Sequence, residues 1–203
     1  MKKWMSLFDL CPIRPSEQKE RAARITAMSY LRDCQDKEQH MEKQLLNTGE
    51  YILLRGKDSY NGLLQKIETN LVSRITGRAI MDLYNSVPKS YRKNAVFLMN
   101  TVTLNELSRS LGADRNLLSS RDDGTFMLMD HPVVLCNAMP FISKGSVPIL
   151  FGDFGKVSIE DCGRDELQQE PCEGNPGTQQ YTLTGYMDCM LEEQLAVRGI
   201  KIV

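Results

Sequence analysis

Cysteine and histidine are the residues of this sequence best suited to chemistry, and their spacing limits what they could do. The six cysteines are Cys11, Cys34, Cys136, Cys162, Cys172 and Cys189. A zinc site needs pairs at short spacing such as Cys-x-x-Cys, and no such pair occurs. Only His40 and His131 could add imidazole ligands, and neither lies at ligand spacing from two cysteines. We therefore expect no metal site, and scattered single thiols that suit a reducing cytoplasm.

Acidic residues offer a second route to chemistry. A group of four could imitate a metal site: Glu160, Asp161, Asp165 and Glu166. Because such groups in polar loops are usually solvated, we expect no metal there. Asp153, which follows Gly152, could hold a cation or a phosphate, but a turn aspartate more often bonds to its own backbone. His131 precedes Pro132 and an apolar run, so a packed or surface role is favoured over that of a general base.

The motifs of common enzymes are missing. The sequence contains no Gly-x-x-x-x-Gly-Lys-Ser/Thr loop, no Gly-x-Gly-x-x-Gly and no Gly-x-Ser-x-Gly. We therefore expect no catalytic residue, no cofactor and no enzymatic activity. Lys and Arg number 25 against 26 for Asp and Glu, which lacks the basic excess of a dedicated nucleic-acid binder. No run approaches the ~20 apolar residues of a membrane span, and no signal-peptide core follows Met1, so a cytoplasmic protein is predicted.

The first third of the chain predicts one long helix. Residues 1–15 read as an irregular lead-in that ends at its prolines. Ser16 is a suitable N-cap, and no Pro or Gly follows until Gly49, which predicts a helix from Ser16 to about Asn47. At 1.5 Å per residue this helix would be ~45 Å long, a spine rather than an element of a compact domain. A coiled coil is the alternative, but no seven-residue repeat is sustained.

The rest of the chain predicts a mixture of helices and short strands. A helix starts near Thr76 and ends at Pro88, and Thr101 or Thr103 can cap another helix that runs through Leu111. A polar loop occupies residues 163–177, and residues 179–197 form one long strand or a strand pair. The remaining predicted strands are 94–100, 125–129, 132–136, 149–151, 156–161 and 199–203. The fold class is therefore α+β.

Four segments are informative as an ordered set. The first is residues 91–100, which end in Met-Asn ahead of a Thr-initiated helix, and the second is Asp-His-Pro-Val-Val at 130–134, leading to Ala-Met-Pro at 138–140. The third is residues 149–154, which end in Phe-Gly-Asp-Phe, and the fourth is the extended 181–197 followed by Gly-then-apolar 199–203. In this order they resemble the Hong Kong 97-type major capsid proteins of tailed phages, over about residues 45–203.

This resemblance implies a Hong Kong 97-type capsid fold with a long spine helix. A peripheral lobe of long antiparallel strands would comprise residues 16–50 and 153–197, and an axial α/β lobe residues 51–152 and 198–203. Family members carry an N-terminal arm and a two-stranded extension loop before the spine helix. Because only about fifteen residues precede the predicted helix, we expect both to be missing and the chain to be truncated. Some relatives crosslink a lysine of that loop to a neighbour's asparagine, and no crosslinking residue is assigned here.

The resemblance also implies a function. It predicts a structural subunit of a phage or prophage icosahedral capsid that forms pentamers and hexamers with copies of itself. Scaffold, portal and packaged double-stranded DNA would be further partners, and no membrane would be involved. The protein would lie in the host bacterial cytoplasm during assembly and in the virion afterwards. The alternatives are an encapsulin-like compartment shell and a small ligand-binding α+β domain, which would need a pocket of convergent polar groups.

Overall fold

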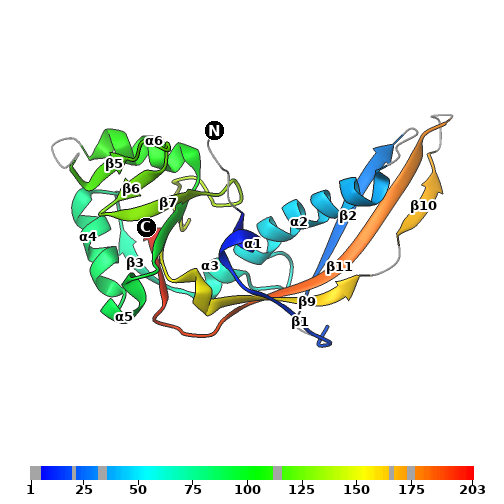
Figure 1. Ribbon diagram of the computed structural model, residues 1–203, viewed down its shortest axis with the longest axis horizontal. Helices are drawn as coiled ribbons and strands as arrows, with labels where there is room; N and C mark the ends of the chain where they lie inside the picture. Colours follow the sequence, from blue (N-terminus) through cyan, green and yellow to red (C-terminus); the bar gives the residue numbers. More distant parts are fainter. Residues whose placement is uncertain (1–5, 20–21, 32–35, 112–115, 165–166, 173–176) are drawn as a thin grey trace.

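The chain forms two lobes of unequal shape (Figure 1). The computed structural model describes residues 6–19, 22–31, 36–111, 116–164, 167–172 and 177–203. An elongated lobe is built on a five-stranded sheet and a compact lobe on a seven-stranded sheet. In the described residues the chain crosses from one sheet to the other three times: before β3, after β8 and after β11.

The elongated lobe is organised around one long strand, β11 (Gln179–Leu191). β11 pairs antiparallel with β2 (Ala23–Leu31), with β9 (Val157–Arg164) and with β10 (Gln168–Pro171). β1 (Ile13–Pro15) adds a parallel strand beside β9. Helix α2 (Lys37–Arg55) lies along one face of this sheet (Figure 1). A Cβ added at Gly185 of β11 would lie 3.0 Å from Leu45 Cδ2, so the missing side chain lets helix and sheet approach closely.

The helix predicted from Ser16 to Asn47 is wrong in its first half. Residues 23–31 form strand β2, in which buried and exposed residues alternate strictly. This period of two is that of a strand with one covered face. The nine-residue pairing with β11 outweighs the helical propensity of the segment, since propensity is a weak prior that tertiary contacts override. Cys34, within the predicted helix, lies outside the described residues.

The end of the predicted helix is also corrected. α2 begins at Lys37 and continues through Gly49 to Arg55, with Gly56 as its C-cap. Gly49 is buried, and a Cβ there would lie 3.1 Å from Ile25 Cδ1, so this glycine serves packing rather than termination. Residues 1–36 therefore precede the helix, and the expectation of about fifteen residues ahead of it is wrong.

The lead-in is more regular than expected. The short helix α1 (Leu7–Leu10) begins with a capping box, in which Ser6 accepts a hydrogen bond from the helix and Asp9 bonds back to Ser6. β1 then joins the sheet. The predicted polar loop at 163–177 is likewise partly strand, because β9 extends to Arg164 and β10 follows.

The compact lobe is a mixed sheet in the order β3-β12-β8-β4-β7-β6-β5. Helices α4 (Gly77–Ser86) and α6 (Thr101–Ser110) pack on one face through Ile80, Leu83 and Leu107. The strands are β3 (Glu68–Val72), β4 (Val96–Met99), β5 (Leu118–Ser120), β6 (Phe126–Leu128), β7 (His131–Leu135), β8 (Ile149–Gly152) and β12 (Val197–Ile202). Three short helical turns complete the chain: α3 (Leu63–Lys66), α5 (Lys89–Arg92) and the 3₁₀ turn η2 (Phe154–Lys156).

Most predicted elements of the compact lobe are confirmed. Thr76 caps α4 by accepting a hydrogen bond from Ala79 N–H, as the sequence indicated. The cap of α6 was wrongly assigned, because Asn100 rather than a threonine accepts from Thr103 N–H. The short elements α3, β3, α5 and β5 were not predicted, since none is long enough to show a period.

Two apolar clusters fill the molecule. One lies entirely in the compact lobe and includes the stacked rings of Phe97 and Phe151, whose centroids are 4.3 Å apart. The other joins the lobes, because Leu98 and Leu150 of the compact sheet share it with Leu45 and Leu53 of α2. The compact sheet is therefore covered on both faces.

Candidate functional site

His131 is a packed side chain in the compact lobe. Its ring lies 5.6 Å from that of Tyr84 and 5.2 Å from that of Phe151, centroid to centroid. Its Nδ1 is 3.1 Å from the carbonyl oxygen of Ala95. Within the described residues, the contacts of this ring are with Tyr84, Phe151 and the Ala95 carbonyl, and none is with an acidic or nucleophilic side chain. The packing role that the sequence favoured for His131 is consistent with these contacts.

The acidic candidates do not converge. Glu160 and Asp161 lie on β9, whereas Asp165 and Glu166 are outside the described residues. Within the parts of the chain that the structure describes, no three His, Cys, Asp or Glu residues are placed to hold a metal ion. Asp153 Oδ1 accepts a hydrogen bond from Gly155 N–H at 3.0 Å, which confirms the turn role predicted for it.

Three cysteines are buried thiols of low reactivity. Five cysteines in the described residues are free: Cys11, Cys136, Cys162 and Cys189 are buried, and Cys172 is partly exposed. Burial raises the pKa of both Cys136 and Cys189 to about 12, and the pKa of Cys11 is raised further. Because the thiolate is the nucleophile and the metal ligand, such thiols act as small apolar side chains.

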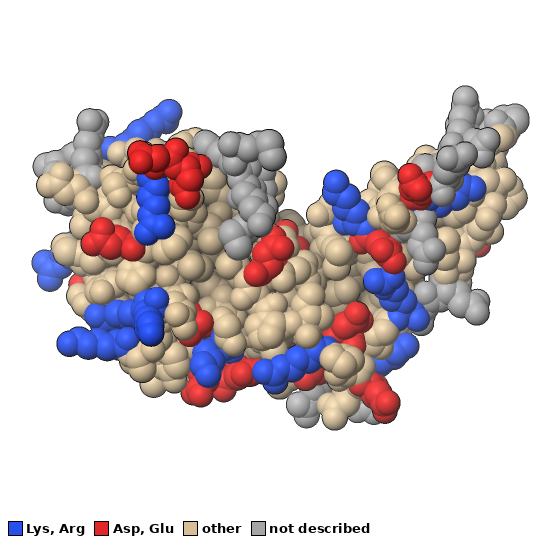
Figure 2. Space-filling model, in the orientation of Figure 1, with Lys and Arg blue, Asp and Glu red and all other residues tan. Residues whose placement is uncertain are grey.

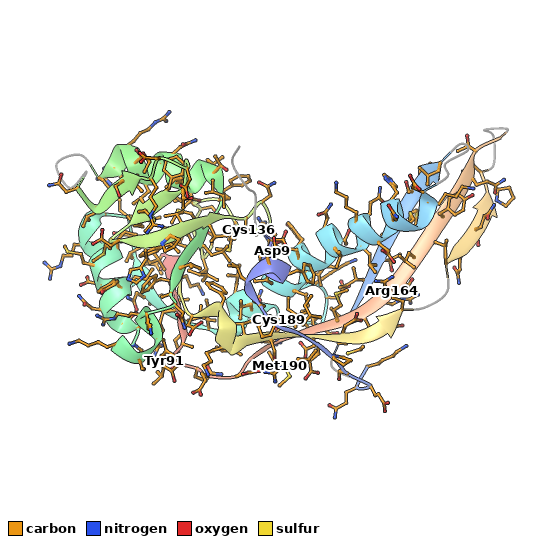
Figure 3. The ribbon with its side chains drawn as sticks, in the orientation of Figure 1. Asp9, Tyr91, Cys136, Arg164, Cys189 and Met190 are labelled. Atoms are coloured by element: carbon orange, nitrogen blue, oxygen red, sulfur yellow. The ribbon has the colours of Figure 1, made fainter. Side chains whose placement is uncertain are left out.

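A polar network joins α3 and its preceding loop to β11. Asp188 Oδ1 accepts three hydrogen bonds: from Tyr60 OH at 2.8 Å, from Lys66 Nζ at 3.0 Å and from Cys189 N–H at 2.7 Å. Lys66 Nζ also donates to the carbonyl of Cys189 at 2.6 Å. Figure 3 labels Cys189 on this part of the strand. The sequence signal that we did not use was Asp188 itself, an acid in the middle of an apolar strand.

The geometry of this network suits a structural role, in which it positions the loop, rather than a catalytic one. A polar-lined hollow of about 610 Å³ opens beside it, lined in part by Asn61 and Glu160. Burial, followed by the charge of Asp188, raises the pKa of Tyr60, so the phenol stays a protonated donor. The lysine and the carboxylate pair with each other at 3.0 Å. The network therefore fixes the loop after α2 to the elongated sheet.

Arg55, the last residue of α2, forms a second joint. Its Nε donates to the carbonyl of Ala138 at 2.6 Å, and its Nη2 donates to that of Met139 at 2.9 Å. Asn100 Nδ2 donates to the same Met139 carbonyl at 3.0 Å. The Met-Pro turn that the sequence singled out therefore anchors the compact lobe to the end of the long helix.

Glu50, one turn earlier on α2, holds the N-terminal segment at the same junction. It accepts a hydrogen bond from Leu7 N–H and lies beside the thiol of Cys136 and the carboxylate of Asp9. Asp9 and Cys136 are labelled between the lobes in Figure 3. Burial is the main cause of the raised pKa of Glu50.

Two crossings between the lobes touch each other at Gly152. Its φ is +157°, and a Cβ built there would lie 2.1 Å from the carbonyl oxygen of Ala196. Asp153 N–H donates to that same oxygen at 3.0 Å, and Glu192 N–H donates to the carbonyl of Lys156 at 2.9 Å. The strand leaving the compact lobe and the strand entering it are therefore bound side by side.

The described surface carries no wide area of one charge on the face seen in Figure 2. Lys and Arg alternate there with Asp and Glu in small groups over both lobes. Such a face lacks the broad positive field of a dedicated nucleic-acid binder. None of the helices in the described ranges is long and apolar enough to cross a membrane.

Solved structures with the same architecture are subunits of closed shells. The capsid of an empty GTA particle aligns with a TM-score of 0.68 at 15% identity, over 100% of this chain and 91% of that chain. The holo-SrpI encapsulin complex from Synechococcus elongatus aligns at 0.64 and 14% identity, over 96% and 86%. A virus-like particle from Pyrococcus furiosus aligns at 0.55 and 9% identity, over 97% and 92%. No curated protein matches the sequence.

The two-lobed α+β architecture is thus the Hong Kong 97-type capsid fold. The model of the phage capsid family matches residues 43–192, and the chain belongs to that family. Family and fold together point to a structural protein of a capsid shell that associates with copies of itself.

Proposed function

We propose that this chain is the structural subunit of an icosahedral phage or prophage capsid and carries out no catalysis. Copies of it would assemble into pentamers and hexamers in the host cytoplasm and enclose double-stranded DNA without reading its sequence. Scaffold and portal proteins would be further partners during assembly.

The full-length structural match carries this proposal. The similarity to the GTA capsid extends over the whole chain rather than over one lobe. A shell subunit works through repeated contacts, each of which buries area that a single copy exposes. The raised pKa values of the buried thiols and the mutual engagement of Lys66 and Asp188 support a role without covalent chemistry.

The two lobes would have separate places in the shell. The elongated lobe, with α2 and the long strands, would be peripheral, and the compact lobe would lie near the five-fold and six-fold axes. The predicted boundaries, 16–50 and 153–197 against 51–152 and 198–203, stand as part of this proposal.

The assembly state of the purified chain tests the proposal. Size-exclusion chromatography with light scattering, followed by negative-stain microscopy, is expected to give pentamers, hexamers or closed shells. A monomer at all concentrations, without any larger species, would contradict it.

An encapsulin-like compartment is the second candidate, favoured by the match to the holo-SrpI complex. Such a shell would enclose a protein cargo instead of a genome. Shells purified from the native host and treated with nuclease separate the candidates: protected DNA supports the capsid, whereas a single enclosed protein supports the compartment.

A further inference from the structure

We propose that neighbouring copies join head to tail, with the crossover at residues 192–195 of one copy seated in a basic groove at the lobe junction of the next. This inference rests on the proposed function, which requires copies to associate. It specifies which two surfaces of neighbouring copies are in contact.

The groove lies where the end of α2 and α3 face the compact lobe. It has a volume of about 410 Å³, within the range of pockets that hold a small ligand or a few side chains. Apolar atoms of Leu64, Ile67 and Val147 line its interior. Arg55, Thr69, Pro140 and Lys201 are also among its lining residues.

Exposed apolar side chains surround this groove. Tyr51 is 48% exposed and its hydroxyl accepts a hydrogen bond from Arg55 Nη1 at 3.0 Å. Phe141 is 59% exposed and follows the lining residue Pro140 in the chain. Leu71 is 65% exposed and pairs in register with Lys201. Exposed apolar groups gathered around a hollow mark a surface that a partner covers.

The charge of the groove is positive. Arg55 and Lys201 are its charged lining residues, and Lys144 is exposed on the loop that forms one wall. No lining residue is acidic. Arg55 donates to carbonyl and hydroxyl oxygens but to no carboxylate, and within the described chain Lys144 and Lys201 form no ion pair. An acidic partner segment would supply what this chain does not.

The crossover between β11 and β12 has the complementary character. Its residues are Glu192, Glu193, Gln194 and Leu195, all exposed, and Leu195 is 47% exposed. Glu192 pairs with Arg14 at 2.8 Å, whereas the Glu193 carboxylate accepts a hydrogen bond from Tyr91 OH at 3.2 Å and forms no ion pair within the described chain. The crossover therefore presents an acidic side chain next to an apolar one. The buried Ala196 and Val197 fix its position.

The two surfaces are different parts of the molecule. In Figure 1 the crossover forms the lower margin between the lobes, whereas the groove is lined by residues of α3, β3, β12 and the loop after β7. Two different patches give a heterologous contact. A heterologous contact that closes on itself builds a ring, the symmetry that a pentamer or hexamer requires.

A second copy fits the groove better than nucleic acid does. Phosphate binding would use the three basic residues, but it would leave Tyr51, Leu71 and Phe141 exposed. An acidic loop that ends in leucine covers both kinds of group. The groove and the crossover also occur in a fixed one-to-one ratio, since every copy carries both.

Charge reversal tests the contact. We expect Lys201→Glu and Glu193→Lys each to weaken self-association about tenfold, measured by light scattering across a concentration series. Carrying both changes in one chain should restore association, because the reversed groove then meets a reversed crossover. Lys43→Glu and Glu106→Lys are the matched controls, since both residues are exposed away from either surface, and they should leave association unchanged.

A cysteine pair gives a readout that does not depend on affinity. With Phe141→Cys and Leu195→Cys in one chain, oxidation should produce a ladder of covalent oligomers beyond the dimer, and neither single variant should. If the parent chain associates but the reversals have no effect and no ladder forms, this contact is wrong and the capsid function stands. If Lys201→Glu leaves association intact but lowers DNA retention in the particle, the groove binds nucleic acid and the proposal fails. A parent chain that never associates would overturn the proposed function as well.

Discussion

The two lobes differ in how they are stabilised. The compact lobe has an apolar cluster of its own, around Phe97 and Phe151, and its sheet is covered on both faces. The elongated lobe has none of its own in the described residues, because its cluster continues into the compact lobe through Leu98 and Leu150. We therefore expect the compact lobe to keep its own cluster when the elongated lobe opens, whereas the elongated lobe depends on its neighbour. A subunit built in this way has a rigid end and a dependent end.

The largest expected effect comes from a substitution in the core of the compact lobe. Phe151→Ala removes a fully buried ring that stacks on Phe97, which we expect to lower the free energy of unfolding by about 4 kcal/mol. Because the elongated lobe depends on the compact one, amide hydrogen exchange should accelerate in both.

Leu45→Ala is the matched change in the elongated lobe, expected to cost about 3 kcal/mol. It should accelerate exchange in β2, α2 and β11 while the compact lobe stays protected. Equal acceleration of hydrogen exchange in both lobes for both variants would show that the two lobes unfold as one cooperative unit and do not differ in stability.

The next effect concerns the connections between the lobes. Gly152→Ala would bring a Cβ against the backbone of Ala196, which requires the two crossings to separate. We expect a loss of about 3 kcal/mol in denaturant unfolding, as for other overpacked sites. Gly124→Ala is the control, because the φ of Gly124 is also positive, at +83°, and nothing lies within 4 Å of a Cβ built there. Similar losses for both would show that backbone strain, not the crossing, is responsible.

The polar network gives a smaller effect. Asp188→Asn keeps the shape but removes the charge that pairs with Lys66, and we expect a loss of about 2 kcal/mol. A double-mutant cycle with Lys66→Met measures the coupling between the two residues by chemical denaturation. Strictly additive losses would mean that the pair does not bind the loop to β11.

The smallest effect is that of pH on Glu50. Burial raises the pKa of Glu50 above its ordinary value of 4.5, so ionisation is harder in the folded protein than in the unfolded chain. Its contribution to stability is therefore fullest when the group is protonated, and it is lost as pH rises through the folded pKa.

Glu50→Gln should remove this loss and keep an acceptor for Leu7 N–H. Its stability should match the parent at pH 4 and exceed it at pH 7, measured by urea unfolding at both values. Glu106→Gln, at an exposed position, is the control. A lower stability of Glu50→Gln at pH 7 would show that the charge itself holds α1 in place.

The sequence was most informative where local signals agree with the final contacts. Thr76 and Pro88 bound α4, and the apolar run at 96–99 is the buried strand β4, because caps and proline act within a few residues. β2 was missed because the partner that makes it a strand lies about 150 residues away. The joint of Tyr60, Lys66 and Asp188 was hidden for the same reason, since Asp188 lies more than 120 residues from the other two.

The three crossings between the lobes also affect what recombination between related genes can do to this protein. The compact lobe is encoded as two separate stretches, from β3 to β8 and at β12, with the β9–β11 strands between them. A single exchange between two related genes therefore cannot transfer that lobe without also transferring the β9–β11 strands. An exchange that falls between β8 and β12 would join a compact sheet from one parent to a terminal strand from another, so β12 must match β3 and β8 for such a recombinant to fold.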